Sequence, residues 1–405
     1  MKGRTEMSAD PRDPAARHAV HPVRSPWASA VRLVAIALAV VVASTACIAA
    51  IGVWTLSRTV AANAVDISNG EIPSIGAMDG AFNVLLVGAD NAPGQKTWGA
   101  SRETTLNDVN ILVHIAADHR SGVVVSLPRD LVIPHPQCVD PRTDAVYPAM
   151  TAEPLNTAFT RGGLGCVVAT VESLTGVKVP YAALFSFQGT VKMADAVGGV
   201  PICVTKAVDD PDSGLKLPKG RSVVTGRTAL AYLRSRHGVG DGSDLSRIGS
   251  QQAYMSSLLR TMMSRSTFTD PGKLYGLASA AAENVKLSKS LASVDTIVTM
   301  ALALKSMNLQ HLVFVQYPTG ADPLNANKVV PNVELADALM RRVRADKQVA
   351  LDSSSLGLST KVIGKKKASS SSGSATPAPT KTSKTVISGL RGQTAAQKTC
   401  SIAAG

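Results

Sequence analysis

The sequence predicts an α/β protein: a layered α-β-α domain with a central mixed sheet, preceded by one transmembrane helix. Apolar runs typical of strands alternate with helical patterns between about residues 80 and 345, as expected for helices on both faces of a buried sheet. An uncharged stretch, 33–56, precedes this region. After residue 345 the apolar pattern ends, so we expect the folded domain to cover 81–345.

The stretch 33–56 is long enough to cross a membrane, since its helix would span about 36 Å against a hydrocarbon core of about 30 Å. Residues 1–32 carry six Lys and Arg against three acidic residues, so the positive-inside rule predicts that 1–32 is cytoplasmic and that everything after the helix lies outside the cell membrane. The alternative is a cleaved signal peptide, but its apolar part normally covers only about 7–15 residues. We therefore expect an uncleaved anchor.

A spacer, 57–80, should follow the anchor. Short runs rich in Val, Ile and Leu predict strands at 82–88, 109–115, 122–127, 179–187, 200–205 and 311–318. Helical spacing of apolar residues predicts helices near 166–174, 188–196, 228–233, 271–284 and 291–306, with a further helix starting near Asp244.

The end of the chain has a different composition. Residues 346–385 contain mainly Ser, Lys, Thr, Ala and Pro, which cannot bury enough apolar surface to offset the entropy of ordering, so we expect a flexible tether. Residues 386–405 regain apolar character and carry Cys400.

Cysteine usage fits an extracytoplasmic domain. Cys47 lies in the apolar stretch, which leaves Cys138, Cys166, Cys203 and Cys400 in a compartment that favours disulfides. Four thiols allow three pairings, and the sequence alone does not choose among them. Cys138 and Cys166 flank a Pro-rich loop that they could close, which would leave Cys203 for Cys400. The alternative is four free, buried thiols.

The net charge of +13 indicates a polyanionic neighbour: nucleic acid, an acidic membrane surface or an anionic wall polymer. A nucleic-acid regulator would need a cytoplasmic domain, contrary to the flanking charges. Aromatic residues, at 4%, are also scarce for stacking on bases. We therefore predict no nucleic-acid partner.

Most of the functional information lies in 233–252, LRSRHGVGDGSDLSRIGSQQ. Arg234 and Arg236 precede a Gly-rich turn. Asp244, Arg247 and Gln251 then share one face of the following helix, being spaced i, i+3 and i+7. Because guanidinium groups match the geometry of phosphate oxygens, the segment predicts an anion-binding site.

Further polar residues lie at the ends of predicted strands, where sites of α/β sheets gather. Asp90 follows the first strand, Arg129 and Asp130 follow the third, and Asp108 directly precedes the second. Carboxylates can hold Mg²⁺, or Mn²⁺ in its place, and arginines can neutralise a departing phosphate. The set predicts metal-assisted phosphoryl transfer. The sequence contains neither a P-loop nor a GxSxG motif.

Six motifs, taken in order, resemble the LytR–CpsA–Psr family of bacterial cell-wall enzymes, in its actinobacterial branch. They are NVLLVGAD, NDVNILVHI, SLPRDLVIP, LNTAFTRGG, ADAVGGVPICV and ALAYLRSRHGVGDGSDLSRIGSQQ. The resemblance implies a membrane-anchored phosphotransferase that moves a glycopolymer from a polyprenyl-diphosphate carrier onto peptidoglycan, forming a phosphodiester at the primary hydroxyl of N-acetylmuramic acid. It also implies a deep apolar pocket for the polyprenyl chain.

Carried over by motif, the resemblance implies roles for nine residues. Asp90 and Asp108 match the magnesium-linked carboxylates. The diphosphate-binding positions match Arg129, Arg234, Arg236, Arg247 and Gln251, and the catalytic set consists of Asp90, Asp108, Arg129, Arg234 and Arg236. Asp130 and Asp244 fall inside matching motifs as supporting residues.

Two positions depart from the family pattern. Leu106 stands where many members have Arg, and Pro154 stands where many have Lys; Arg102 is a candidate to reach the site instead. Two other functions therefore stay open: a polyprenyl-diphosphate pyrophosphatase, with water replacing the sugar hydroxyl, and a non-catalytic lipid or wall-polymer binding protein. The polymer itself could be arabinogalactan, a teichoic-type polymer or a capsular polysaccharide.

Overall fold

The computed structural model describes residues 26–67, 80–89, 105–141, 143–264, 270–352, 355–357, 359–363 and 386–404. Two units can be distinguished, Met1–Trp54 and Thr55–Gly405.

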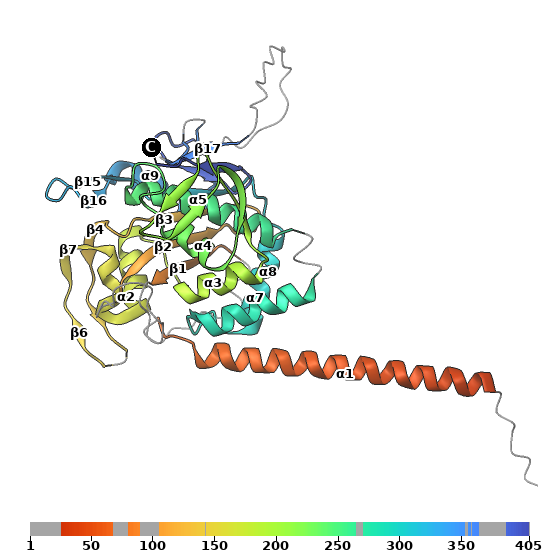
Figure 1. The fold of residues 1–405 in the computed structure, drawn as a ribbon. Coiled ribbons are helices and arrows are strands. Elements are labelled where there is room, and N and C mark those ends of the chain that lie inside the picture. Colours follow the sequence, from red (N-terminus) through yellow and green to blue (C-terminus); the bar gives the residue numbers. More distant parts are fainter. Residues whose placement is uncertain are drawn as a thin grey trace, which may run out of the picture. The chain divides into compact units, whose positions relative to one another are not determined.

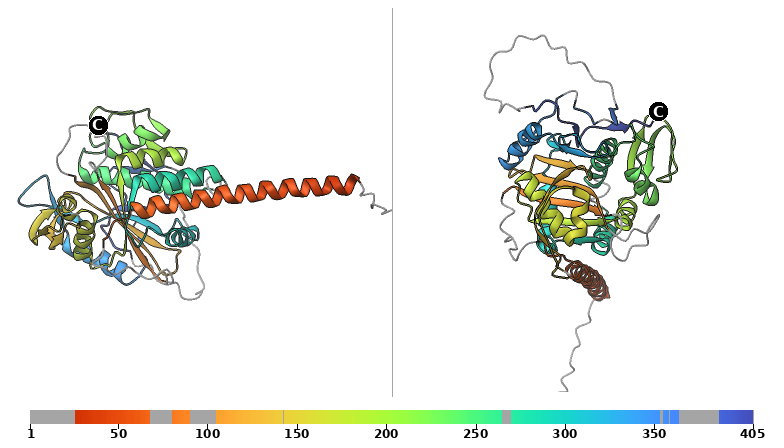
Figure 2. Two further views of the ribbon diagram at one scale, coloured as in Figure 1. Left: turned by 90° about the horizontal axis from the view of Figure 1, so that it is seen from below. Right: turned by 90° about the vertical axis from the view of Figure 1, so that its left-hand side faces the viewer.

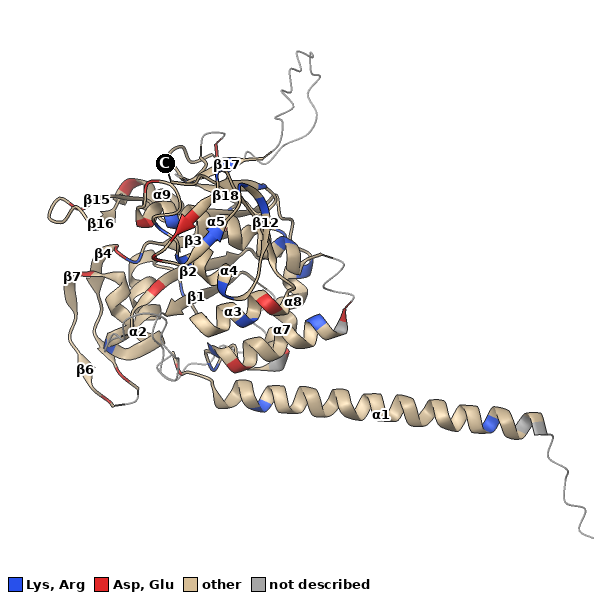
Figure 3. Cartoon of the chain, in the orientation of Figure 1, with Lys and Arg blue, Asp and Glu red and all other residues tan. Residues whose placement is uncertain are grey.

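The described part of the first unit belongs to helix α1 (Pro26–Ala62), a helix of 37 residues (Figure 1). Its segment Ser29–Ala62 is long and apolar enough to cross a membrane, and its charged residues, Arg32 and Arg58, lie near its two ends (Figure 3). The prediction of one long apolar N-terminal helix is confirmed. Its orientation stays a prediction.

The second unit is built on a seven-stranded sheet with the order β13-β8-β1-β2-β3-β14-β18. In that order the strands are Val285–Leu287, Tyr181–Ser186, Phe82–Ala89, Asn107–Ile115, Gly122–Leu127, Leu312–Gln316 and Gly392–Thr394. The pairs β1–β8 and β3–β14 are parallel and the remaining neighbours are antiparallel. The predicted mixed sheet is confirmed.

Helices cover both faces of this sheet (Figure 2). Because neighbouring residues of a strand point to opposite faces, Leu85 and Val87 belong to a buried cluster with side chains of α2 (Ala158–Thr175) and α9 (Val333–Arg344), while Val84 and Leu86 belong to the cluster on the other face. That second cluster includes side chains from α3 (Phe187–Ala196), α5 (Asp244–Met262), α7 (Pro271–Asn284) and α8 (Val294–Lys305). The layered α-β-α arrangement is therefore the observed one.

A smaller sheet, β12-β9-β19-β17, packs with α4 (Gly226–Arg234) and α5 around a third cluster of buried residues. Its strands are Gly220–Val224, Val200–Val204, Thr399–Ser401 and Thr360–Val362. Since β17 pairs with β19, the packed domain extends past residue 345 into the stretch that we assigned to a tether. Residues 364–385 lie outside the described residues.

Short hairpins and one 3-10 turn complete the unit. The paired strands are β4 (Val132–His135) with β7 (Met150–Pro154), β5 (Cys138–Val139) with β6 (Val146–Tyr147), β10 (Val208–Asp210) with β11 (Leu215–Leu217), and β15 (Thr319–Ala321) with β16 (Val329–Pro331). The turn, η2 (Leu155–Thr157), leads into α2. The spacer prediction was partly wrong, because 57–62 continue α1 and Val65 bridges to Ser288.

Both disulfides join the favoured partners. Cys138 is bonded to Cys166, which connects β5 to α2, and Cys203 is bonded to Cys400, which connects β9 to β19. Cys47 is free. The bond at Cys400 fixes the end of the chain against the small sheet.

Candidate active site

A pocket of about 660 Å³ lies between the ends of β1, β2 and β8 and the helices α3, α4 and α5. Along α5, Arg247 and Gln251 line it first and Leu258 and Met262 line it last, over a rise of about 22 Å. The pocket is therefore polar near the start of α5 and apolar toward its end. The apolar lining is completed by side chains such as Ile111, Phe185, Met193, Leu230 and Met255.

Local sequence fixes the polar face of α5. Ser243 caps the helix, its hydroxyl accepting a hydrogen bond from the Ser246 amide at 3.1 Å. Gln251 donates from Nε2 to the Leu233 carbonyl at 3.0 Å and so fixes the end of α4 against α5. The expectation that Asp244, Arg247 and Gln251 share a face is confirmed.

Arg129 stands at the centre of a network of ion pairs. Its Nη1 donates to Asp108 Oδ1 at 2.6 Å. Its Nε lies 3.3 Å from Asp244 Oδ1 and 3.5 Å from Asp130 Oδ2. Arg247 joins the network through Nη2, which lies 2.6 Å from Asp244 Oδ1. Side chains from three separate segments of the chain, those at Asp108, at Arg129 and along α5, are thus in contact.

The network keeps its arginines charged. Burial opposes the charge on Arg129, but the attraction of Asp108, their hydrogen bond and the charges of Asp244 and Asp130 outweigh it and raise the pKa of Arg129 above its ordinary value. Burial lowers the pKa of Arg247, with Asp244 opposing that shift. Because arginine ordinarily titrates above about 12, both remain cations at neutral pH.

Several buried polar atoms here have no hydrogen-bond partner. They are Nε of Arg236 and of Arg247 and Oδ2 of Asp244. Unsatisfied buried groups are rare in folded proteins, because each costs about 1–3 kcal/mol. Their concentration in one place is typical of a site that a ligand completes.

A β-bulge positions Asp108. The pairing of β1 with β2 shifts between Gly88 and Ala89, which face Val109 and Asn107, so Asp108 is the extra residue. The neighbouring Asn107 is fully buried; it donates to Leu155 O at 3.0 Å and accepts from the Phe159 amide at 3.1 Å. Asn107 thus connects the bulge to the start of α2, a role that its sequence position did not reveal.

Lys328 is a further residue that the sequence did not single out. Its Nζ lies 2.6 Å from Asp130 Oδ1, and the following Val329 donates its amide to the Asp130 carbonyl at 3.2 Å. On the other side, the Asn156 amide donates to the Arg129 carbonyl at 3.0 Å. The loop that carries Arg129 and Asp130 is therefore held from two directions.

The Arg234–Arg236 segment is supported from outside the motif. The guanidinium of Arg234 lies 4.7 Å from the centre of the Phe187 ring, a cation–π contact. After Arg236 the chain turns through Gly240, whose φ of 60° suits glycine and whose amide donates to the Ile402 carbonyl at 2.7 Å. The sequence did not predict that Phe187 or the C-terminal segment would support the site.

Eight of the nine predicted residues therefore lie in or beside one pocket: Asp108, Arg129, Asp130, Arg234, Arg236, Asp244, Arg247 and Gln251. Asp90 and Arg102 lie outside the described residues. At the two departures from the family pattern, Leu106 directly precedes β2 and Pro154 ends β7, paired with Val132. Lys328 supplies a cation beside Asp130.

The carboxylates around Arg129 fit a hard cation in chemical type, because Mg²⁺ prefers oxygen ligands, and Oδ2 of Asp244 accepts no hydrogen bond. Asp108 already has an ion pair, with Arg129. A different group, Asp210, Asp212 and His237, brings three potential metal ligands within 4.8 Å of one another. There Asp210 accepts hydrogen bonds from Ser235 Oγ at 2.6 Å and the Gly238 amide at 3.3 Å, so it orders the loop.

Fold and site define a layered α/β protein with an elongated pocket that is apolar at one end and lined by arginines at the other. A model of the LytR_cpsA_psr family matches residues 53–343, most of the chain. The chain belongs to the LytR–CpsA–Psr family, as the six motifs indicated.

Individual relatives are similar over part of their length. Cell wall biosynthesis protein LcpA of Corynebacterium glutamicum is 34% identical over 238 residues, which cover 53% of this chain and 46% of that protein. The chain thus spans about half the length of the curated relatives it matches.

Solved structures share the fold. A LytR-Csp2A-Psr enzyme from Actinomyces oris is 22% identical with a TM-score of 0.51, covering 69% of this chain and 94% of that one. A structure of TagT bound to LIIa-WTA is 21% identical with a TM-score of 0.50, covering 70% of this chain and 98% of that one.

Proposed function

We propose that this protein is a membrane-anchored, extracytoplasmic phosphotransferase that moves a glycopolymer from a polyprenyl-diphosphate carrier onto peptidoglycan. The observation that carries the proposal is the two-ended pocket, because a polyprenyl diphosphate has an apolar chain and an anionic head. Family membership supports a wall polymer as cargo, as do LcpA, a cell wall biosynthesis protein, and the TagT structure with LIIa-WTA.

In this proposal the two parts of the pocket bind the two parts of the donor. Leu258, Met262 and their apolar neighbours contact the polyprenyl chain, each buried methylene contributing about 0.8 kcal/mol. Arg129, Arg234 and Arg236 bind the diphosphate oxygens through several N–H donors each. Arg247 and Gln251 complete the polar end.

A divalent cation would be held by Asp90 and Asp108 of this chain. When bound, Mg²⁺, or Mn²⁺ in its place, would supply positive charge that offsets the charge of the diphosphate. The carboxylates of Asp130 and Asp244 hold Arg129 in place through their ion pairs.

The reaction exchanges one phosphate ester bond for another. The primary hydroxyl oxygen of N-acetylmuramic acid attacks the phosphorus that carries the glycopolymer, forming the phosphodiester. The bond from that phosphorus to the bridging oxygen breaks, and polyprenyl phosphate leaves with the electron pair. A carboxylate of the network around Arg129 takes the hydroxyl proton. The arginines stabilise the charge that develops on the leaving phosphate.

The test uses the full chain in liposomes with Mg²⁺, a polyprenyl-diphosphate-linked glycopolymer and peptidoglycan. We expect polyprenyl phosphate to be released, and polymer to become attached, only when peptidoglycan is present. Equal release without peptidoglycan would identify a pyrophosphatase instead. Tight donor binding without release under either condition would identify a binding protein.

Substitutions separate the site from general charge effects. Arg234→Ala and Arg236→Ala should each reduce transfer about 100-fold, the scale of losing one donor to a developing anion. Arg341→Ala is the matched control, because Arg341 is an exposed arginine of α9, which packs on the opposite face of the sheet. Equal losses in all three variants would refute the assignment.

A further inference from the structure

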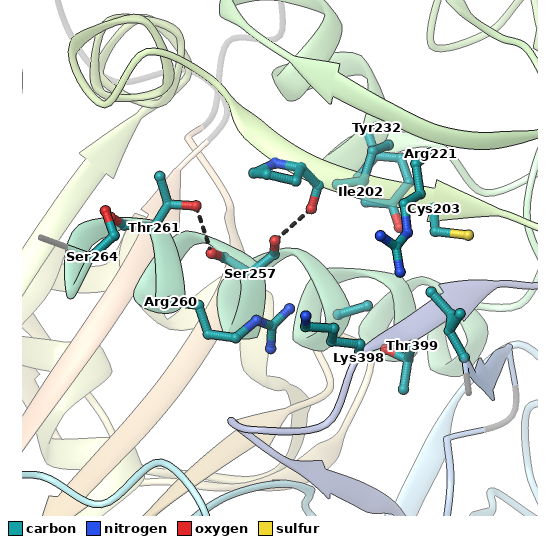
Figure 4. A pocket seen from close by; sticks show the side chains of 13 residues that line it. Ile202, Cys203, Arg221, Tyr232, Ser257, Arg260, Thr261, Ser264, Lys398 and Thr399 are labelled. Carbon is teal, nitrogen blue, oxygen red and sulfur yellow. Dashed lines mark hydrogen bonds between the residues drawn. The ribbon is translucent and has the colours of Figure 1, made fainter. Parts of the chain in front are cut away.

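A second pocket, of about 420 Å³, lies on the other side of α5, between that helix and the small sheet (Figure 4). Leu258 and Met262 line the first pocket, whereas Ser257 and Arg260 line this one. At about 100° per residue the two sets point to opposite faces of the helix. One helix therefore forms a wall of both pockets.

Three cations line the second pocket, and they come from three elements. Arg221 belongs to β12, Arg260 to α5, and Lys398 directly precedes β19. Their charged groups point into the same space in Figure 4. Its lining includes no carboxylate, and across the described residues no ion pair within 4.0 Å neutralises any of the three. Gathered like charges repel, so an anion would be attracted here.

Arg260 is held in place without being neutralised. Its Nη1 donates to the Ala395 carbonyl at 2.6 Å and to the Gln397 carbonyl at 3.0 Å. Burial lowers the pKa of Arg260, which is the cost of keeping a cation there. A guanidinium fixed by backbone carbonyls has further N–H groups free to donate, a preorganised arrangement for an oxyanion.

Beside the cations the pocket has a polar and an apolar wall. The polar wall has the hydroxyls of Ser257 and Thr261, and the apolar wall has Ile202 and the half-buried Ile363. A sugar ring has both apolar faces and hydroxyl groups, and the pocket volume is within the usual range for small ligands, about 300–1,000 Å³.

We propose that this pocket is an anion subsite that takes a phosphate group of the wall glycopolymer, with an attached sugar against Ile202 and Ile363. This proposal rests on the proposed function for the presence of a wall glycopolymer as cargo. Phosphate fits because several N–H donors from two guanidinium groups and an ammonium meet its several acceptor oxygens. The first pocket then binds the lipid diphosphate and the second binds the polymer that the lipid carries.

The Cys203–Cys400 disulfide builds the subsite. Cys203 lines the pocket, and its bond to Cys400 brings Lys398 and Thr399 to the pocket wall. Without that bond the lysine would depend on the short pairing of β19 for its position.

The test titrates the full chain, in an uncharged detergent, with inorganic phosphate by calorimetry. The wild type should bind at two sites. Changing Arg221→Ala and Lys398→Ala together should weaken one site about 100-fold, since a hydrogen bond to a charged group commonly contributes about tenfold. Lys347→Ala, an exposed cation after α9, should change neither site.

A second titration decides the source of the phosphate. A short phosphodiester-linked sugar oligomer should bind the subsite at least tenfold more tightly than inorganic phosphate, and the phosphate-free oligomer should not compete. Two unchanged sites in the double variant, or an oligomer no better than free phosphate, would overturn the proposal.

The outcome is distinguishable from that of the proposed function. Arg234→Ala should remove the other phosphate site and leave this one. Loss of both sites in the Arg234→Ala variant would also overturn the subsite, whereas absence of transfer with both sites intact would count against the transferase alone.

Discussion

Replacing Arg129 by Met should destabilise the folded domain because it leaves carboxylates unpaired. Asp130 would keep Lys328 and Asp244 would keep Arg247. Among the described residues, Asp108 has no cation other than Arg129 within 4.0 Å. The change is therefore expected to act mainly through Asp108.

The magnitude follows from burial. The Arg129 and Asp108 side chains are 17% and 15% exposed. Breaking a buried ion pair costs about 3–5 kcal/mol, and slight exposure reduces this, so we expect about 2–3 kcal/mol for Arg129→Met. In an Asp108→Asn background the same substitution should cost about 1 kcal/mol, because the uncompensated charge is gone.

The measurement is urea unfolding of the full chain in micelles for the wild type, the two single variants and the double variant. The pKa of Arg129 is higher in the folded than in the unfolded state. Its contribution to folding stability is therefore fully present below the pKa of the unfolded state, and it is lost only as the pH rises through the pKa of the folded state, far above neutrality. The wild type should thus keep this contribution across the neutral range and up to about pH 9. An equal deficit in both backgrounds would refute the reasoning.

Three further outcomes are expected. Replacing Cys203 and Cys400 by Ser should reduce the free energy of unfolding by about 5 kcal/mol, because the bond closes a loop of 197 residues; chemical denaturation measures this. Burial, together with the charge of Arg161, lowers the pKa of His135 to about 4. The free energy of unfolding should therefore fall by about 3 kcal/mol as the pH drops from about 6.5 to about 4. His135→Gln should remove this pH dependence, as measured by thermal melts. Leu258→Asp should abolish binding of a polyprenyl phosphate to the full chain while leaving its fold intact, as followed by lipid co-purification and circular dichroism.

Each has a control. Replacing Cys138 and Cys166 by Ser opens a loop of 28 residues and should cost less, about 4 kcal/mol; the reverse order would contradict the loop argument. A stability of His135→Gln that still falls between about pH 6.5 and 4 would assign the titration to another group. For the lipid pocket, Leu274→Asp changes an exposed leucine of α7, and equal loss of lipid there would reject the pocket.

Local sequence was sufficient for the elements that position the polar face of α5. The spacing of Asp244, Arg247 and Gln251 fixes a common helix face whatever surrounds it, and the Ser243 cap sets where the helix begins. In the same way, the apolar runs identified the central strands, because their burial on both faces leaves a continuous hydrophobic signal. Helix α9 was missed although its apolar residues follow a helical spacing.

The sequence by itself determined the family, the apolar N-terminal helix, the central strands and the polar segment from Arg234 to Gln251, because each depends on residues that are neighbours along the chain. Only the tertiary structure decided which side chains from distant parts of the chain come into contact. Lys328 reaches Asp130 over 198 positions, and the segment at Cys400 forms the wall of a second pocket. Such contacts follow from the packing of whole layers, and the local sequence around a residue does not reveal which distant residue it contacts.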